Sequence, residues 1–178
     1  TRQKGLAHLL RAWKDVPAEF GLVLAAGSPD EEGIGNEVAA LIAELQSTRS
    51  NVWWIKEMLP HDQLTAMLTA ADLFICPSIY EPLGIVNLEA MGCETAVLGS
   101  RVGGIPEVVA DKETGELVDY NGEAAPFEKA LTESITRLMS QPDLLKKYGA
   151  AGRVRAQKLF GWDAVAALTV DLYRRVIA

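Results

Sequence analysis

Few residues in this sequence suit a disulfide, a metal site or a membrane segment. Among its 178 residues are two cysteines, Cys76 and Cys93, each beside apolar residues at a spacing that fits no metal-ligand pattern. We expect both to be reduced, buried thiols, which favours a cytoplasmic protein. No apolar run approaches the ~20 residues of a membrane helix, and the first residues lack a signal-peptide pattern. We therefore expect no metal, no cofactor and no membrane segment.

The sequence also lacks an excess of positive charge. It has 17 basic and 24 acidic residues, which gives a formal net charge of −7. Such a surface repels the phosphates of nucleic acids and anionic lipids, so we expect neither as a partner. An anionic ligand would have to be held locally, by a helix N-terminus or a single lysine.

Apolar residues alternate along the chain between helical stripes and short continuous runs. This alternation predicts an α/β fold with a doubly wound, Rossmann-like parallel sheet, in one domain over residues 1–178. The chain opens on a helix, and we expect the first strand of the fold to precede residue 1. The runs that we interpret as strands lie at residues 21–27, 51–55, 73–76, 95–98 and 116–119. Helices are expected near residues 6–13, 38–45, 64–71, 85–91, 127–139, 144–160 and 165–177, with a further helix starting near Pro106.

One segment carries most of the predicted chemistry. Residues 77–92 follow a predicted buried strand and turn through Gly84 into a short helix. In an open α/β sheet, the carboxyl ends of the strands form the ligand crevice. The amides of Gly84, Ile85 and Val86 would be unpaired donors at the positive end of the helix dipole, and this arrangement suits a diphosphate.

Two glutamates flank this turn. Glu81 precedes it, and Glu89 lies within the predicted helix. At ~1.5 Å per residue, the five steps from Gly84 to Glu89 span about 7–8 Å, so we expect the carboxylates to have separate binding duties. A retaining glycosidase is an alternative, because it also uses two carboxylates, but it needs them ~5–5.5 Å apart. A non-catalytic nucleotide-binding module is a further alternative.

The stretch from Glu81 to Gly92, Glu-Pro-Leu-Gly-Ile-Val-Asn-Leu-Glu-Ala-Met-Gly, resembles the signature of glycosyltransferase family 4, the retaining enzymes of the two-domain GT-B fold. Three other stretches agree with the family and follow its order. They are Gln3-Lys4-Gly5-Leu6, the glycine loop at residues 102–109 and the strand at residues 115–118. Within the family, the sequence looks closest to bacterial glycogen synthases that use ADP-glucose and form maltose 1-phosphate.

The resemblance implies particular roles. Lys4 would neutralise the departing diphosphate, whose charge develops most fully in the transition state. Glu81 would bind hydroxyls of the transferred sugar, and Glu89 would accept hydrogen bonds from the ribose. Ile55 and Lys56 lie where the family lines its base pocket. The resemblance thus implies transfer of glucose, with retention, from ADP-glucose to an α-glucan or to glucose 1-phosphate; a UDP- or GDP-sugar is the close alternative.

One position departs from the family pattern. The family pairs its lysine with an arginine a few residues upstream, and that position would precede Thr1; Arg2 does not fill it. The sequence also lacks an initiator methionine. We therefore expect residues 1–178 to be the C-terminal donor domain of a longer enzyme whose N-terminal domain binds the acceptor. Alone, these residues should transfer no sugar, and they should bind nucleotide weakly because the crevice is open and Lys4 lies near a frayed terminus.

Other patterns carry little chemistry. Residues 33–38 partly match a dinucleotide-binding fingerprint, but they lack its third glycine and follow an acidic loop. Asp62 is expected to cap the helix at 64–71, which leaves His61 without a catalytic role. His8 is expected at the surface or between domains. The tryptophans, which we expect in the core or an interface, are Trp13, Trp53, Trp54 and Trp162, with a carbohydrate platform as the alternative for Trp53 or Trp54.

Overall fold

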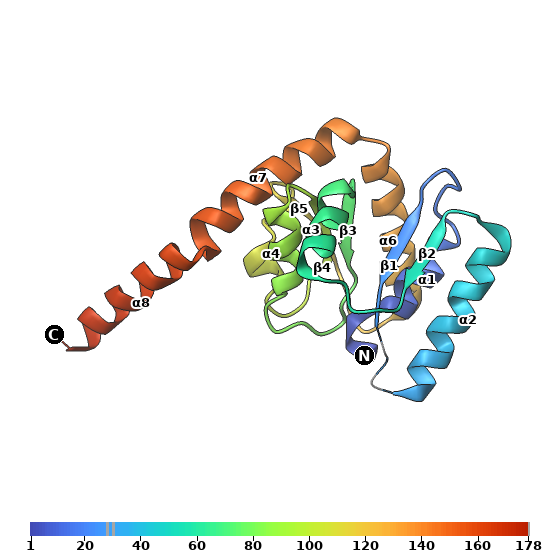
Figure 1. Ribbon diagram of the computed structural model, residues 1–178, viewed down its shortest axis with the longest axis horizontal. Helices are drawn as coiled ribbons and strands as arrows, with labels where there is room; N and C mark the ends of the chain where they lie inside the picture. Colours follow the sequence, from blue (N-terminus) through green and yellow to red (C-terminus); the bar gives the residue numbers. More distant parts are fainter. Residues whose placement is uncertain (28, 30, 178) are drawn as a thin grey trace.

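Parallel strands flanked by helices make up the computed structural model, which describes residues 1–27, 29 and 31–177 (Figure 1). The strands are β1 (Leu22–Ala25), β2 (Val52–Ile55), β3 (Leu73–Cys76), β4 (Ala96–Ser100) and β5 (Gly115–Val118). A short 3-10 helix, η1 (Arg2–Lys4), precedes the α-helices. These are α1 (Leu6–Trp13), α2 (Glu32–Thr48), α3 (His61–Ala70), α4 (Ile85–Gly92), α5 (Ile105–Val108), α6 (Ala124–Met139), α7 (Pro142–Phe160) and α8 (Trp162–Ile177). The predicted α/β alternation is confirmed.

The strands form two hydrogen-bonded groups rather than the one sheet that we predicted. β1 pairs with β2, and β3, β4 and β5 pair in that order, all in parallel. In the usual doubly wound order, the first strand lies between the second and the fourth. β1 and β3 would be those two neighbours, and the described residues supply no strand to join them. Whether a strand fills this position stays a prediction.

The core lies on both faces of the three-stranded group. Successive side chains of a strand point to opposite faces. On β4, Leu98 therefore joins a cluster with residues of α1, α2 and α6, whereas Val97 joins a second cluster with residues of α4 and α5. All five residues of β4 are buried, which explains the unbroken apolar run in its sequence. Cys76 is buried as expected, but Cys93 is only half-buried; both thiols are free.

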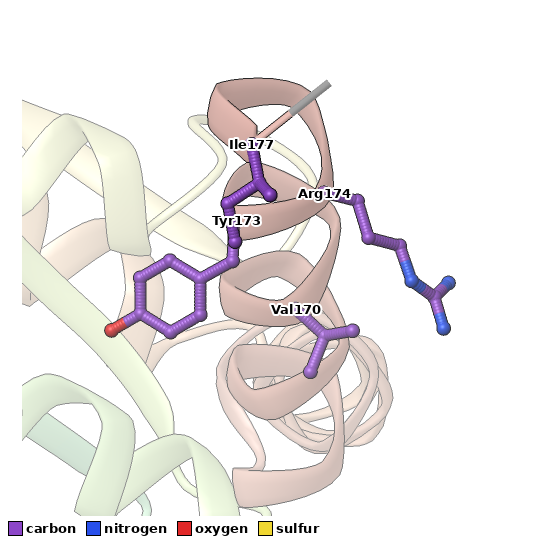
Figure 2. Close-up of a pocket in the computed structure, with 4 residues that line it drawn as sticks. All are labelled: Val170, Tyr173, Arg174 and Ile177. Carbon is purple, nitrogen blue, oxygen red and sulfur yellow. The ribbon is translucent and has the colours of Figure 1, made fainter.

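Helix α8 does not join this core. None of its described residues is buried, and Figure 1 shows it extending away from the strands beyond the end of α7. Trp162 at its start is 88% exposed and Trp53 of β2 is 52% exposed, so neither lies in the core, and an interface position for them stays a prediction; Trp13 is buried as predicted. A hollow on α8 is lined by Val170, Tyr173, Arg174 and Ile177 (Figure 2), none of which belongs to the predicted site. Among the described residues, no helix has both the length and the apolar character needed to cross a membrane.

A buried carboxylate ties β5 to two helices. Glu116 is 2% exposed, and it accepts hydrogen bonds from Arg137 of α6 at 3.1 Å and from Tyr148 of α7 at 3.3 Å. Lys112 adds an ion pair at 2.5 Å. Burial alone would raise the pKa of Glu116, but hydrogen bonds from Arg137 and Lys112 outweigh burial and hold this pKa below its ordinary value. The folded protein therefore favours the ionised form.

Replacing Arg137 with methionine should destabilise the protein at neutral pH. The variant leaves a buried carboxylate with a weaker set of donors, and we expect the free energy of unfolding to fall by about 2–3 kcal/mol. A depressed carboxyl pKa contributes stability above its unfolded value, and this contribution is lost as the pH falls through the folded pKa. The difference from wild type in urea unfolding should therefore shrink below about pH 4. If the unfolding free energies of variant and wild type differ by the same amount at neutral pH and below about pH 4, this account is contradicted. Lys129→Met is the control, because its pair with Glu133 is exposed and spans 3.8 Å.

Candidate functional site

Residues 2–5 are anchored to the loop that follows β3. Ile79 N–H donates to the carbonyl of Gln3 at 2.8 Å. Gly5 adopts φ +64, and a Cβ at this position would lie 1.8 Å from the carbonyl oxygen of Pro77, so only glycine fits. The expectation that Lys4 lies near a frayed terminus is therefore wrong, because backbone contacts far along the chain fix its position. An open crevice remains as the reason to expect weak nucleotide binding.

Lys4 and Glu81, the two predicted catalytic residues, are in contact. Lys4 Nζ lies 2.6 Å from Glu81 Oε2, and the side chains are 54% and 9% exposed. Ser78 Oγ donates to the same carboxylate oxygen at 3.4 Å, and Ser100 Oγ at the end of β4 donates to the carbonyl of Ser78. Glu81 Oε1 has no hydrogen-bond partner within the described part of the chain.

The turn into α4 has the geometry that the sequence predicts. Gly84 caps the helix with φ +89, and no described residue accepts a hydrogen bond from the amides of Gly84, Ile85 or Val86. Ile85 is 63% exposed and Val86 38% exposed, so this end of the helix faces solvent. Glu81 Cγ lies 3.4 Å from where a Cβ of residue 84 would be, which places the carboxylate beside the turn. An anion at this turn would meet the free amides, and Lys4 contacts the carboxylate beside the turn.

The glycine loop after β4 holds this arrangement from the other side. Gly104 N–H donates to the carbonyl of Glu81 at 3.0 Å. A Cβ at Gly103 would lie 1.9 Å from the same carbonyl oxygen, and one at Gly104 would lie 2.4 Å from that of Pro82. The sequence indicated this loop only as a family motif, and its contact with Glu81 was not foreseen. Ser78 and Ser100 were also missed, since isolated serines carry no sequence signal.

The remaining predicted binding residues lie outside these contacts. Glu89 is half-buried on α4, and its carboxylate forms no ion pair or hydrogen bond with a described residue. Ile55 is half-buried at the end of β2, and Lys56 is exposed, with Nζ 4.3 Å from the ring centroid of Trp54. The indole N–H of Trp54 donates to the carbonyl of Ala26 at 3.0 Å. The roles of Glu89, Ile55 and Lys56 stay predictions.

Neither histidine belongs to the site. His8 Nδ1 lies 2.7 Å from Glu128 Oε1, and its ring packs on Phe127 at 5.7 Å between centroids, so this half-buried residue joins α1 to α6. His61 is the first residue of α3 and follows the N-cap Pro60, so the prediction that Asp62 caps the helix is wrong. Over residues 1–27, 29 and 31–177, no group of three or more His, Cys, Asp and Glu side chains is placed to hold a metal ion. The metal-free reaction stays a prediction.

Comparison with protein families identifies the class. Residues 1–155 match the family described as Glycosyl transferases group 1, which is most of the chain. The chain therefore belongs to this family of glycosyltransferases.

Individual relatives refine the comparison. The chain is 48% identical over 179 residues to alpha-maltose-1-phosphate synthase of Mycolicibacterium smegmatis, a match that covers 100% of this chain and 46% of the relative. Sucrose-phosphate synthase from Thermosynechococcus elongatus has a TM-score of 0.83 at 32% identity, over 99% of this chain and 43% of that one. Anabaena HepE in complex with UDP-glucose has a TM-score of 0.77 at 21% identity, over 96% of this chain and 46% of that one, and so shows the fold alone. The fold is that of GT-B C-terminal domains, and the chain spans less than half the length of these proteins.

Proposed function

We propose that residues 1–178 bind the nucleotide-sugar donor of a retaining family 4 glycosyltransferase that moves glucose from ADP-glucose to an α-glucan or to glucose 1-phosphate. One observation carries this proposal: Lys4 and Glu81 are in contact at 2.6 Å beside a helix start whose amides have no partner in the described chain. A phosphate group and a sugar hydroxyl need these complementary groups, a cation with free amides for the first and a carboxylate for the second.

The chemistry follows from the two partners of the ion pair. The donor's diphosphate binds the amides of Ile85 and Val86 and draws the Lys4 ammonium toward its oxygens. Glu81 Oε2 is thereby released and, with Oε1, accepts hydrogen bonds from hydroxyls of the sugar. When the bond between the sugar and the diphosphate breaks, negative charge grows on the leaving group, and Lys4 stabilises it most strongly at that moment. Glu89 binds the ribose, and Ile55 and Lys56 line the base pocket.

The choice of donor rests on relatives. The relative at 48% identity is named for maltose 1-phosphate synthesis, and the structural neighbour at 32% identity for sucrose-phosphate synthesis. Both names support transfer of a hexose. A UDP-sugar remains the alternative donor, supported by the neighbour in complex with UDP-glucose.

The acceptor is assigned to a second domain outside residues 1–178. This proposal is supported by the relatives, of which the chain covers only 46% and 43%. We place the enzyme in the cytoplasm, which is consistent with two free cysteines and no disulfide within the described residues.

Calorimetry with ADP, UDP and GDP tests the donor assignment on the enzyme with both proposed domains, because we expect residues 1–178 alone to bind nucleotide weakly. We expect ADP to bind at least tenfold more tightly than UDP or GDP, a difference of about 1.4 kcal/mol. Equal affinity for the three nucleotides would remove the preference for ADP but leave the donor site in place. Failure of all three to bind would contradict the donor site itself.

A further inference from the structure

The side chain of Asn87 is buried without a hydrogen-bond partner. Asn87 lies in the first turn of α4 and is 0% exposed. Neither its Nδ2 nor its Oδ1 has a partner in residues 1–27, 29 and 31–177. Buried side-chain amides are nearly always paired, and an unpaired one lowers stability. A leucine has a similar volume without this cost, so the presence of asparagine requires an explanation.

The unpaired amide lies directly under the donor-site turn. Its Nδ2 is 2.5 Å from where a Cβ of Gly84 would be. The same point lies 3.4 Å from carbons of Glu81 and Ile105, so the turn packs closely on these side chains. The backbone of Asn87 is also bound to the turn, because its N–H donates to the carbonyl of Gly84 at 2.9 Å. The side chain is therefore within reach of peptide groups that carry the free amides.

We propose that Asn87 is a positioning residue of the donor site: its amide is unpaired in the free protein and forms hydrogen bonds with the backbone of residues 81–84 when a nucleoside diphosphate binds. This inference rests on the proposed function. The diphosphate pulls on the amides of Ile85 and Val86, and the turn shifts by a small distance against the amide beneath it. A bond that exists only in the bound state adds to affinity and not to the stability of the free protein.

Asn87→Leu separates this role from a structural one, because the stability of the free protein should rise while its affinity for ADP falls. Without ligand, the melting temperature of the 178-residue chain should rise by about 2–4 °C, since a buried unpaired amide has been removed. The dissociation constant for ADP, measured by calorimetry on the enzyme with both proposed domains, should increase by about tenfold. A structural asparagine would give a lower melting temperature, and a passive one would leave the affinity unchanged.

Met91→Leu is the matched control, because Met91 is also 0% exposed and lies one turn further along the same helix. This substitution conserves volume, and we expect ADP affinity to be unchanged. A lower melting temperature for Asn87→Leu would overturn the proposal whatever the affinity, since it would mean that the amide is already paired in the free protein. Wild-type affinity for ADP in Asn87→Leu would also overturn it while leaving the donor site intact. If the wild-type enzyme with both proposed domains binds no nucleoside diphosphate, the proposed function fails instead.

Discussion

Replacing Lys4 with alanine should lower the turnover number of the enzyme with both proposed domains by about 10²–10³-fold, the usual effect of removing one preorganised donor to a developing negative charge. Lys4 Nζ contacts Glu81 at 2.6 Å in the free site, so its charge is in place before the donor arrives. Initial rates with saturating ADP-glucose measure the effect. Because the interaction strengthens as the diphosphate leaves, we expect the turnover number to fall more than the Michaelis constant rises.

Two further variants sharpen this test. Glu81→Gln keeps the size of the side chain but removes its charge, and it should also lower turnover; normal turnover would favour a nucleotide-binding module without catalysis. Lys14→Ala is the matched control. Lys14 follows the other end of α1 and pairs with Glu44 at 2.7 Å, so its loss should leave the rate unchanged. An equal loss in both lysine variants would point to a general effect of charge.

Gly103→Ala should nearly abolish turnover, although no side chain of the predicted site is altered. Gly103 has φ +50, a conformation that costs other residues about 1–3 kcal/mol. A Cβ at this position would lie 1.9 Å from the carbonyl oxygen of Glu81, so the backbone that carries this carboxylate must move. Displacement of a reacting group by ~1 Å costs about 10²-fold in rate. Turnover in the two-domain enzyme and thermal unfolding together measure the effect.

Gly33→Ala provides the comparison for Gly103→Ala. Gly33 lies in the first turn of α2, and a Cβ there would meet no atom within 4 Å. Alanine is a better helix former than glycine, so we expect equal or slightly higher stability and an unchanged rate. If Gly103→Ala keeps turnover within about twofold of wild type, the glycine loop does not position Glu81.

The sequence predicted those parts of the site that depend on near neighbours in the chain. A glycine followed by a short apolar helix is a local pattern, and the free amides of Gly84, Ile85 and Val86 follow from it. The contact between Gly103 and Glu81 joins residues that are 22 positions apart, and no periodicity reports such a distance. The family resemblance gave Lys4 and Glu81 separate roles, and neither it nor their spacing predicted that they are in contact.

In the fold, too, local features were predicted and long-range contacts were not. The apolar runs placed all five described strands, because strands buried on both faces carry a continuous apolar signal. The separation into two hydrogen-bonded groups was not predicted, since a run does not say which strand lies beside it. Asp62 matched the composition of a cap, yet the N-cap of α3 is Pro60, two residues earlier. Trp162 has a typical core side chain, but it begins a helix that leaves the body of the protein.

The proposed donor site is assembled mainly by the main chain, and this bears on how such enzymes diverge. Glycines in close contact with carbonyl groups join its three segments, while the side chains of Ile85 and Val86 are 63% and 38% exposed. Substitutions at these exposed positions can therefore accumulate at little cost to folding. Related enzymes can therefore change their specificity for nucleotide and sugar through side chains on the surface of the pocket, while the backbone arrangement of the site is kept.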